Sequence, residues 1–225
     1  MFELRDPPAR MLVRREQVRI GHDALPGTLV ICGRPSGIIV FSDDCTRDIR
    51  NVRNLHFARV FRHYGLATLM CDLLTEQEEG ERGLAQDTQL LGSRLLEFLR
   101  WIDAREDLRG IPVGLLGSSA GTAAALSLAA RDHLRVAAIV SRAGRPDLAL
   151  LDLPLERAAT LLIVGSKNQD MVEFNRSALN ALQCKKRLDI IPNANDLFTE
   201  PGTLDVAAGL AGHWFEQNLK AKEGS

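Results

Sequence analysis

The sequence has no uncharged run of the ~20 residues that a membrane-spanning helix needs. Its first residues alternate charged and apolar side chains and do not resemble a signal peptide. Cysteine pairs in the CxxC spacing are also absent, which argues against the common zinc sites and against a disulfide framework. The four cysteines are Cys32, Cys45, Cys71 and Cys184. These absences predict a cytoplasmic protein that has no membrane segment and holds neither a metal nor another cofactor.

A concentration of positive charge is missing as well. The chain has 28 Lys and Arg residues against 29 Asp and Glu, and the basic residues are spread along its length. Proteins that bind nucleic acid usually gather basic residues on one face, so we expect no nucleic-acid partner. A chain of 225 residues with 45% hydrophobic residues fits one globular domain, residues 1–225, with one large core.

Short apolar runs alternate with longer amphipathic stretches, a pattern typical of a mostly parallel sheet covered by helices. Eight runs predict strands at residues 12–20, 28–32, 38–41, 67–72, 113–117, 136–141, 160–165 and 187–191. The first two favour an antiparallel pair at one edge. Helices are predicted at residues 86–104, 122–131, 171–183 and 203–220, and another after the third strand. The acidic stretch 76–81 is interpreted as a solvated loop.

One motif carries chemistry. The segment Gly117-Ser118-Ser119-Ala120-Gly121 follows a predicted strand and opens a predicted helix, the setting in which Gly-x-Ser-x-Gly forms a nucleophile elbow. The sharp turn would lift the Ser119 hydroxyl above the sheet. It would also aim the Ala120 N–H, at a helix N-terminus, toward a developing oxyanion.

From the elbow outward the sequence resembles the dienelactone hydrolase-like family of the α/β-hydrolase superfamily. The matching segments are LPGTL (25–29), GIIVF (37–41), GLATL (65–69), DLLT (72–75), the elbow, VSRAGRPDL (140–148), LLIVG (161–165) and LFTEPG (197–202). The resemblance implies an α/β-hydrolase fold of about eight strands without a large lid. It also implies a serine hydrolase acting on esters or lactones. Relatives occur alone or fused to a phosphoribosyltransferase-like domain, for which this chain has no room, and a homodimer is compatible with the fold.

The resemblance fails at three places around the serine. Where the family has its triad aspartate this chain has Asn168, and where it has its catalytic histidine this chain has Asp196. The His-Gly loop that helps to build the family's oxyanion hole is replaced here by Asp43, Asp44 and Cys45.

These replacements predict a catalytically impaired or inactive hydrolase homologue. A serine hydroxyl needs an adjacent base, and a carboxylate with a pKa near 4 is a far weaker base than imidazole. Loss of the histidine from such a triad costs on the order of 10⁶ in kcat. If Asp43, Asp44 and Asp196 surround Ser119, their charges also oppose an oxyanion, because like charges ~5 Å apart repel by about 3 kcal/mol at an effective dielectric of 20.

Alternatives stay open at this point. An active carboxylesterase or lactonase could use Asp196, or His56 from the helix after the third strand, as an unusual base. Cys45 is a second candidate nucleophile. The acidic side chains together with Asn168 would offer the hard oxygen ligands that Ca²⁺ or Mg²⁺ prefers.

Two arginines follow the predicted strand at 136–141. Arg142 and Arg145 lie where the carboxyl ends of parallel strands meet, the edge at which open α/β sheets bind ligands. They could bind an anionic group or form structural salt bridges.

Overall fold

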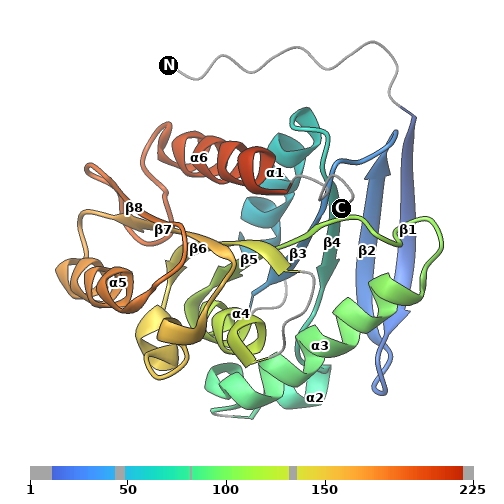
Figure 1. Cartoon of the computed structure of the whole chain (residues 1–225), viewed down its shortest axis with the longest axis horizontal. Helices are drawn as coiled ribbons and strands as arrows, with labels where there is room; N and C mark the ends of the chain where they lie inside the picture. The colour runs from blue at the N-terminus through green and yellow to red at the C-terminus, as the bar shows by residue number, and fades with distance from the viewer. Residues whose placement is uncertain (1–11, 44–48, 82, 132–135, 220–225) are drawn as a thin grey trace.

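A computed structural model describes residues 12–43, 49–81, 83–131 and 136–219. All eight predicted strands are confirmed, and they form one sheet (Figure 1). Most extend the predicted runs by one to three residues. Their bounds are β1 Val13–Ile20, β2 Leu25–Cys32, β3 Ile38–Ser42, β4 Ala67–Cys71, β5 Val113–Ser118, β6 Val136–Gly144, β7 Ala159–Gly165 and β8 Lys186–Ile191.

The sheet has the order β1-β2-β4-β3-β5-β6-β7-β8. The expected antiparallel pair, β1 with β2, forms one edge, and β2 is also antiparallel to β4. Every other pairing is parallel. The carboxyl ends of β3 and β5 to β8 therefore meet at one edge, and the loops that leave them build a common site.

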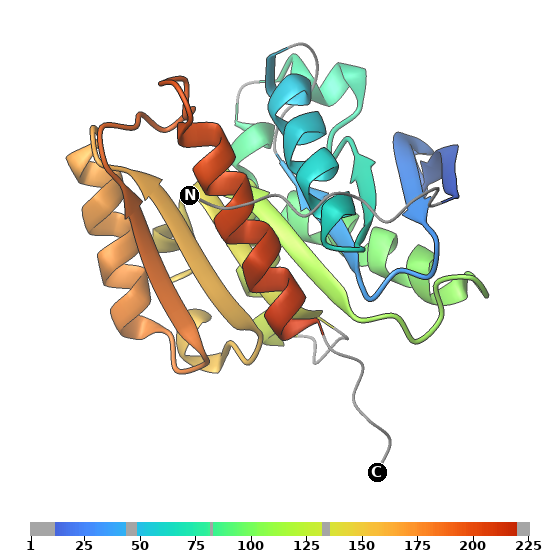
Figure 2. The ribbon, with the colours of Figure 1, turned by 90° about the horizontal axis from the view of Figure 1, so that it is seen from above.

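Helices cover both faces of the sheet, as Figure 2 shows from above. On one face lie α1 (Ile49–His63) and α6 (Thr203–Asn218), and on the other α3 (Thr88–Ala104), α4 (Ser119–Arg131) and α5 (Gln169–Ala181). The strands serve both layers because successive side chains point to opposite faces. In β3, for example, Ile38 and Val40 pack toward α3 and α4, whereas Ile39 and Phe41 pack toward α1 and α6.

The acidic stretch differs from the prediction. Residues Glu76–Glu79 form a short helix, α2, and not an irregular loop. A capping box starts it: the Thr75 hydroxyl accepts from the Glu78 N–H at 3.3 Å, and the Glu78 carboxylate accepts from the Thr75 N–H at 2.8 Å. Two of the N–H groups at the start of the helix are thereby satisfied, which explains the turn of helix.

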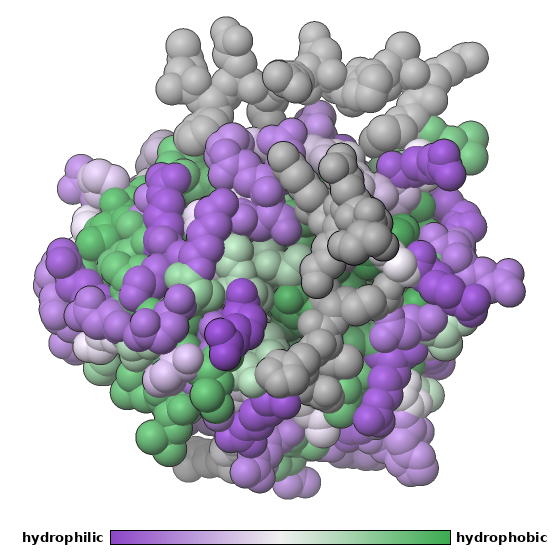
Figure 3. Space-filling view, viewed as in Figure 1, coloured by the Kyte–Doolittle hydropathy of each residue, from purple (hydrophilic) through white to green (hydrophobic). Residues whose placement is uncertain are grey.

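The face seen in Figure 3 mixes hydrophilic and hydrophobic residues, with hydrophobic ones at its left side, in its centre and along its lower edge. The long connection from β6 to β7 contains two short 3₁₀ helices, η2 (Pro146–Ala149) and η3 (Leu153–Leu155), and four exposed leucines: Leu148, Leu150, Leu151 and Leu155. It adds no lid domain. Within the described ranges no helix is long and apolar enough to cross a bilayer.

One buried acid stands out in this connection. Glu156, just before β7, is 1% exposed. One of its carboxylate oxygens accepts from the N–H groups of Arg157 and Ala158, at 2.7 and 2.6 Å. The other is buried with no partner among the described residues. Burial raises the pKa of Glu156 from 4.5 to about 7, against the lowering effect of the two backbone N–H groups.

Stability should consequently fall as pH rises from about 4.5 to about 7, because the folded state keeps a proton there that the unfolded chain has lost. Glu156→Gln should remove this slope and raise the free energy of unfolding at pH 8 by up to about 3 kcal/mol. Urea unfolding at several pH values measures the effect. The exposed Glu173→Gln is the control, and equal pH slopes for Glu156→Gln and the wild type would contradict the expectation.

Candidate active site

Ser119 occupies the turn between β5 and α4. It is the first residue of α4 and has a φ of 46°, a left-handed conformation that a residue with a Cβ adopts only under strain. Ala120 follows it and is buried in the first turn of the helix, whose leading N–H groups have no partner within the helix. The predicted strand–turn–helix setting of the elbow is therefore present.

Two glycines make the turn feasible. A Cβ at Gly117 would lie 2.6 Å from the Thr122 Cα, and a Cβ at Gly121 would collide with the carbonyl oxygen of Ser42 at the end of β3. The Ser42 hydroxyl also donates to the Gly121 carbonyl at 2.6 Å. Any larger residue at these two positions would push the start of α4 away from the sheet.

The elbow is tied to the end of β6. Ser119 forms a parallel bridge with Gly144, and the Arg145 N–H donates to the Ser119 carbonyl at 2.9 Å. This contact places the end of β6, which contains Arg142, and Arg145 just after it directly beside the serine. Ala143, near the end of β6, also has a positive φ, 47°.

Asn168 and Asp196 lie together, as the family's acid and histidine positions would. The Asn168 Nδ2 donates to the Asp196 Oδ2 at 2.6 Å. Asn168 is also the N-cap of α5, since its Oδ1 accepts from the Met171 N–H at 3.2 Å. The second oxygen of Asp196, Oδ1, is buried and has no partner among the described residues. The hydrogen bond from the Met171 N–H fixes the orientation of the Asn168 amide, and this amide in turn positions the Asp196 carboxylate.

Ser119 and Asp196 share a pocket of about 310 Å³ at the carboxyl edge of the sheet. Its lining residues come from α1, the elbow, the end of β6 and the residue after it, the start of α5 and the loop after β8. They are Arg53, Ser118, Ser119, Arg142, Ala143, Arg145, Met171, Asp196, Leu197 and Phe198. No histidine is among them. Two further residues predicted for the site, Asp44 and Cys45, lie outside the described residues.

His56, the candidate for a substitute base, faces another element. Its Nε2 lies 3.0 Å from the Asp205 Oδ1 at the start of α6. The helix α1 does follow β3, as predicted, but the residue that it contributes to the pocket is Arg53 and not His56.

The electrostatic expectation needs correction. Asp43 does not leave a free negative charge beside Ser119, because the Arg142 Nη2 donates to its Oδ2 at 3.0 Å. Both side chains are buried, with 5% and 6% of their surfaces exposed, and the guanidinium stacks 4.9 Å from the centre of the Phe57 ring. Among the described residues the charged lining consists of three arginines and one aspartate, so this lining is cationic and not acidic as expected from the sequence.

The same arrangement weakens the cation-site hypothesis. One oxygen of Asp43, Oδ2, accepts from the Arg142 guanidinium, and only Oδ1 is left without a partner among the described residues. The described part of the chain contains no group of three His, Cys, Asp or Glu side chains suited to a metal ion.

Arg53 and Arg145 complete the cationic lining. Arg145 forms two hydrogen bonds with Asp147, of 2.8 and 2.7 Å, and lies 4.8 Å from the centre of the Phe174 ring. Arg53 is 9% exposed. Sequence reasoning missed Arg53, although an arginine on the buried side of an amphipathic helix is a signal that a periodicity count could have found.

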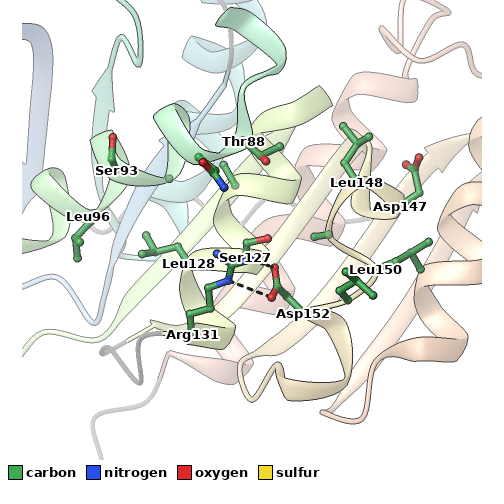
Figure 4. Close-up of a pocket in the computed structure, with 15 residues that line it drawn as sticks. Thr88, Ser93, Leu96, Ser127, Leu128, Arg131, Asp147, Leu148, Leu150 and Asp152 are labelled. Carbon is green, nitrogen blue, oxygen red and sulfur yellow. Dashed lines mark hydrogen bonds and ion pairs between the residues drawn. The ribbon is translucent and has the colours of Figure 1, made fainter.

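A larger pocket, of about 630 Å³, lies between α3, α4 and the η2–η3 connection (Figure 4). Arg131 and Asp152 form a two-bond ion pair in it, with both bonds 3.1 Å long. Leucines and hydroxyl side chains make up most of the remaining wall. Among the described residues its lining contains neither histidine nor cysteine, two side chains that commonly serve as a base or a nucleophile.

The comparisons with known proteins point to one family. A dienelactone hydrolase from Anabaena variabilis ATCC 29413 is 42% identical, with a TM-score of 0.86, over 93% of this chain and 99% of that one. A dienelactone hydrolase-like promiscuous phosphotriesterase from metagenomic libraries (17% identical, TM-score 0.72, 92% of this chain and 98% of that one) shares the fold. So does the esterase domain of a Rhodothermus marinus protein (15%, TM-score 0.70, 92% and 99%).

Two curated relatives come from Mycobacterium tuberculosis strains CDC 1551 and H37Rv, and each is named "Putative phosphoribosyl transferase". Each is 41% identical over 216 residues, which are 95% of this chain. The chain spans about half the length of these relatives, 48%. No model of a protein family matches the chain. The extent and identity of the match to the Anabaena enzyme show that this chain belongs to the dienelactone hydrolase-like family of α/β-hydrolases.

Proposed function

We propose that this chain is a dienelactone hydrolase-like protein with little or no esterase activity. Its former active-site pocket would bind an ester, a lactone or another small molecule without turning it over. The observation that carries the proposal is the hydrogen bond between Asn168 and Asp196 beside Ser119. An amide and a carboxylate stand where general-base catalysis requires a carboxylate and an imidazole.

The pair cannot perform the proton transfers of a triad efficiently. A carboxylate accepts the serine proton weakly, since the ordinary pKa of an aspartic acid lies far below that of a serine hydroxyl. Asn168 donates to Asp196 and cannot take up a proton in exchange. The one histidine considered as a substitute, His56, lies beside Asp205 and does not line the pocket.

A fluorophosphonate probe tests this proposal directly. The full chain and a Ser119→Ala control would be incubated with the probe between about pH 5 and 9, a range that spans the titration of histidine. Intact mass would report covalent labelling. We expect no labelling of folded protein and no hydrolysis of p-nitrophenyl esters above that of Ser119→Ala. Labelling that requires Ser119, together with ordinary ester turnover, would overturn the proposal and favour a carboxylesterase or lactonase that uses Asp196 as its base.

A further inference from the structure

The pocket beside Ser119 combines cationic groups in a way that ester hydrolysis does not require. Three guanidinium groups line it, and two are held rigidly: Arg142 by Asp43 and the Phe57 ring, Arg145 by Asp147 and the Phe174 ring. Asp43 and Asp147 are not lining residues of this pocket, so they support the arginines without facing a ligand.

Arg142 is 4% exposed, and its Nη1 has no hydrogen-bond partner among the described residues. A buried guanidinium N–H without an acceptor is costly, and an anion in the pocket would supply the acceptor. The planar fork of arginine suits the oxygens of a phosphoryl group.

The elbow adds donors of a second kind. Helix α4 is 13 residues long and begins at the pocket with Ser119. The free N–H groups and the positive dipole end of a helix N-terminus favour phosphate groups. In such a site the Ser119 hydroxyl is a hydrogen-bond donor to the anion, a role that needs no general base.

Asp196 limits what the remainder of the ligand can be. Its buried Oδ1 is an acceptor without a donor among the described residues, whereas its Oδ2 is occupied by Asn168. A second anionic group at this point would be repelled, but a ligand hydroxyl would be bound. Backbone strain also gathers here, because Ser119, Ala143 and Phe198 have positive φ angles and all line the pocket. Backbone strain of this kind is often found at functional sites.

From these observations we infer that the Ser119 pocket binds a hydroxylated phosphate monoester of the sugar-phosphate class. The phosphoryl group would lie at the N-terminus of α4 against Arg142 and Arg145, and a hydroxyl of the same ligand would donate to Asp196. This inference rests on the proposed function, because it assigns to the pocket the ligand that is bound without turnover.

Isothermal titration of the full chain at low salt would test it, with glycerol 3-phosphate, inorganic phosphate and glycerol as probes. We expect glycerol 3-phosphate to bind more tightly than inorganic phosphate, and glycerol not to bind. Arg145→Gln should weaken glycerol 3-phosphate binding at least tenfold. Arg131→Gln, which breaks a similar arginine–aspartate pair in the larger pocket, should leave binding unchanged.

Asp196→Asn distinguishes the contribution of the ligand hydroxyl to binding from that of the phosphoryl group. It removes the negative charge, so inorganic phosphate should bind at least as tightly as to the wild type, while the advantage of glycerol 3-phosphate over phosphate should shrink. No binding of either phosphate by folded wild-type protein, or equal weakening by Arg145→Gln and Arg131→Gln, would overturn the inference.

The outcomes are independent of the esterase test. If the protein hydrolysed esters in a Ser119-dependent manner and phosphate inhibited the reaction, the proposed function would be disproved, but the inferred anion site would be supported. Absence of turnover together with absence of phosphate binding would disprove the anion site alone.

Discussion

Asn168→Asp combined with Asp196→His should create Ser119-dependent ester hydrolysis, at least about 10³-fold faster than that of the wild type. The two positions already lie within a hydrogen bond of each other, at 2.6 Å, and position 196 shares the pocket with Ser119. An imidazole at 196 would supply a base with a pKa near the working pH, and a carboxylate at 168 would orient it.

The gain should stay below that of an ordinary family member. The resemblance places Asp43 where the family has the His-Gly loop of its oxyanion hole, and Asp43 is paired with Arg142 instead. Removal of one oxyanion-hole donor costs on the order of 10²–10³ in kcat. The double variant tests the triad separately from that loop.

Initial rates on p-nitrophenyl acetate would measure the effect. Asp196→His alone should give a smaller gain, because Asn168 would favour the wrong imidazole tautomer. Adding Ser119→Ala to the double variant should abolish the new activity. A folded double variant no faster than the wild type would show that the remaining scaffold no longer supports catalysis.

Asp43→Ala should lower the free energy of unfolding by about 3–5 kcal/mol, because it leaves the guanidinium of Arg142 buried and unpaired. That side chain is only 5% exposed, and its Nη1 already lacks a partner among the described residues. Replacing both partners with apolar residues, Asp43→Leu with Arg142→Met, should recover much of the loss, since a buried pair contributes little net stability.

Urea denaturation monitored by tryptophan fluorescence would supply the free energies. Asp147→Ala is the matched control because its partner Arg145 is 38% exposed, so the loss there should be about 1 kcal/mol or less. Equal losses for Asp43→Ala and Asp147→Ala would contradict a special role for burial.

Local patterns in the sequence determined the elements of the fold. All eight strands were predicted, and the central ones, such as β3 and β7, appear as continuous apolar runs because a strand buried on both faces is apolar over its whole length. The edge strand β1 is mostly exposed and carries charged residues. The Gly-x-Ser-x-Gly spacing predicted the elbow because no residue larger than glycine fits at 117 and 121. A local signal was also overlooked: Thr75 and Glu78 have the spacing of a capping box, and they do start a helix.

Alignment with the family's motifs predicted that Asn168 and Asp196 lie close together, and the hydrogen bond between them confirms this. The resemblance also predicted acidic side chains around Ser119, but the described residues that line its pocket include three arginines and one aspartate. A family resemblance identifies which residue occupies a position, but it does not identify the residue with which that side chain forms an ion pair.

The charge of the pocket could not be predicted from local patterns. Asp43 and Arg142 are 99 residues apart in the chain, and Arg53 comes from α1, an element that contributes no residue to the elbow. His56, three residues beyond Arg53, lies against Asp205 of α6 instead. Periodicity assigns a side chain to a face of its own helix or strand, whereas its ion-pair partner depends on how that element packs against the others. The fold of this chain can therefore be predicted from local sequence patterns. The chemistry of its pocket cannot, because it depends on contacts between residues distant in sequence.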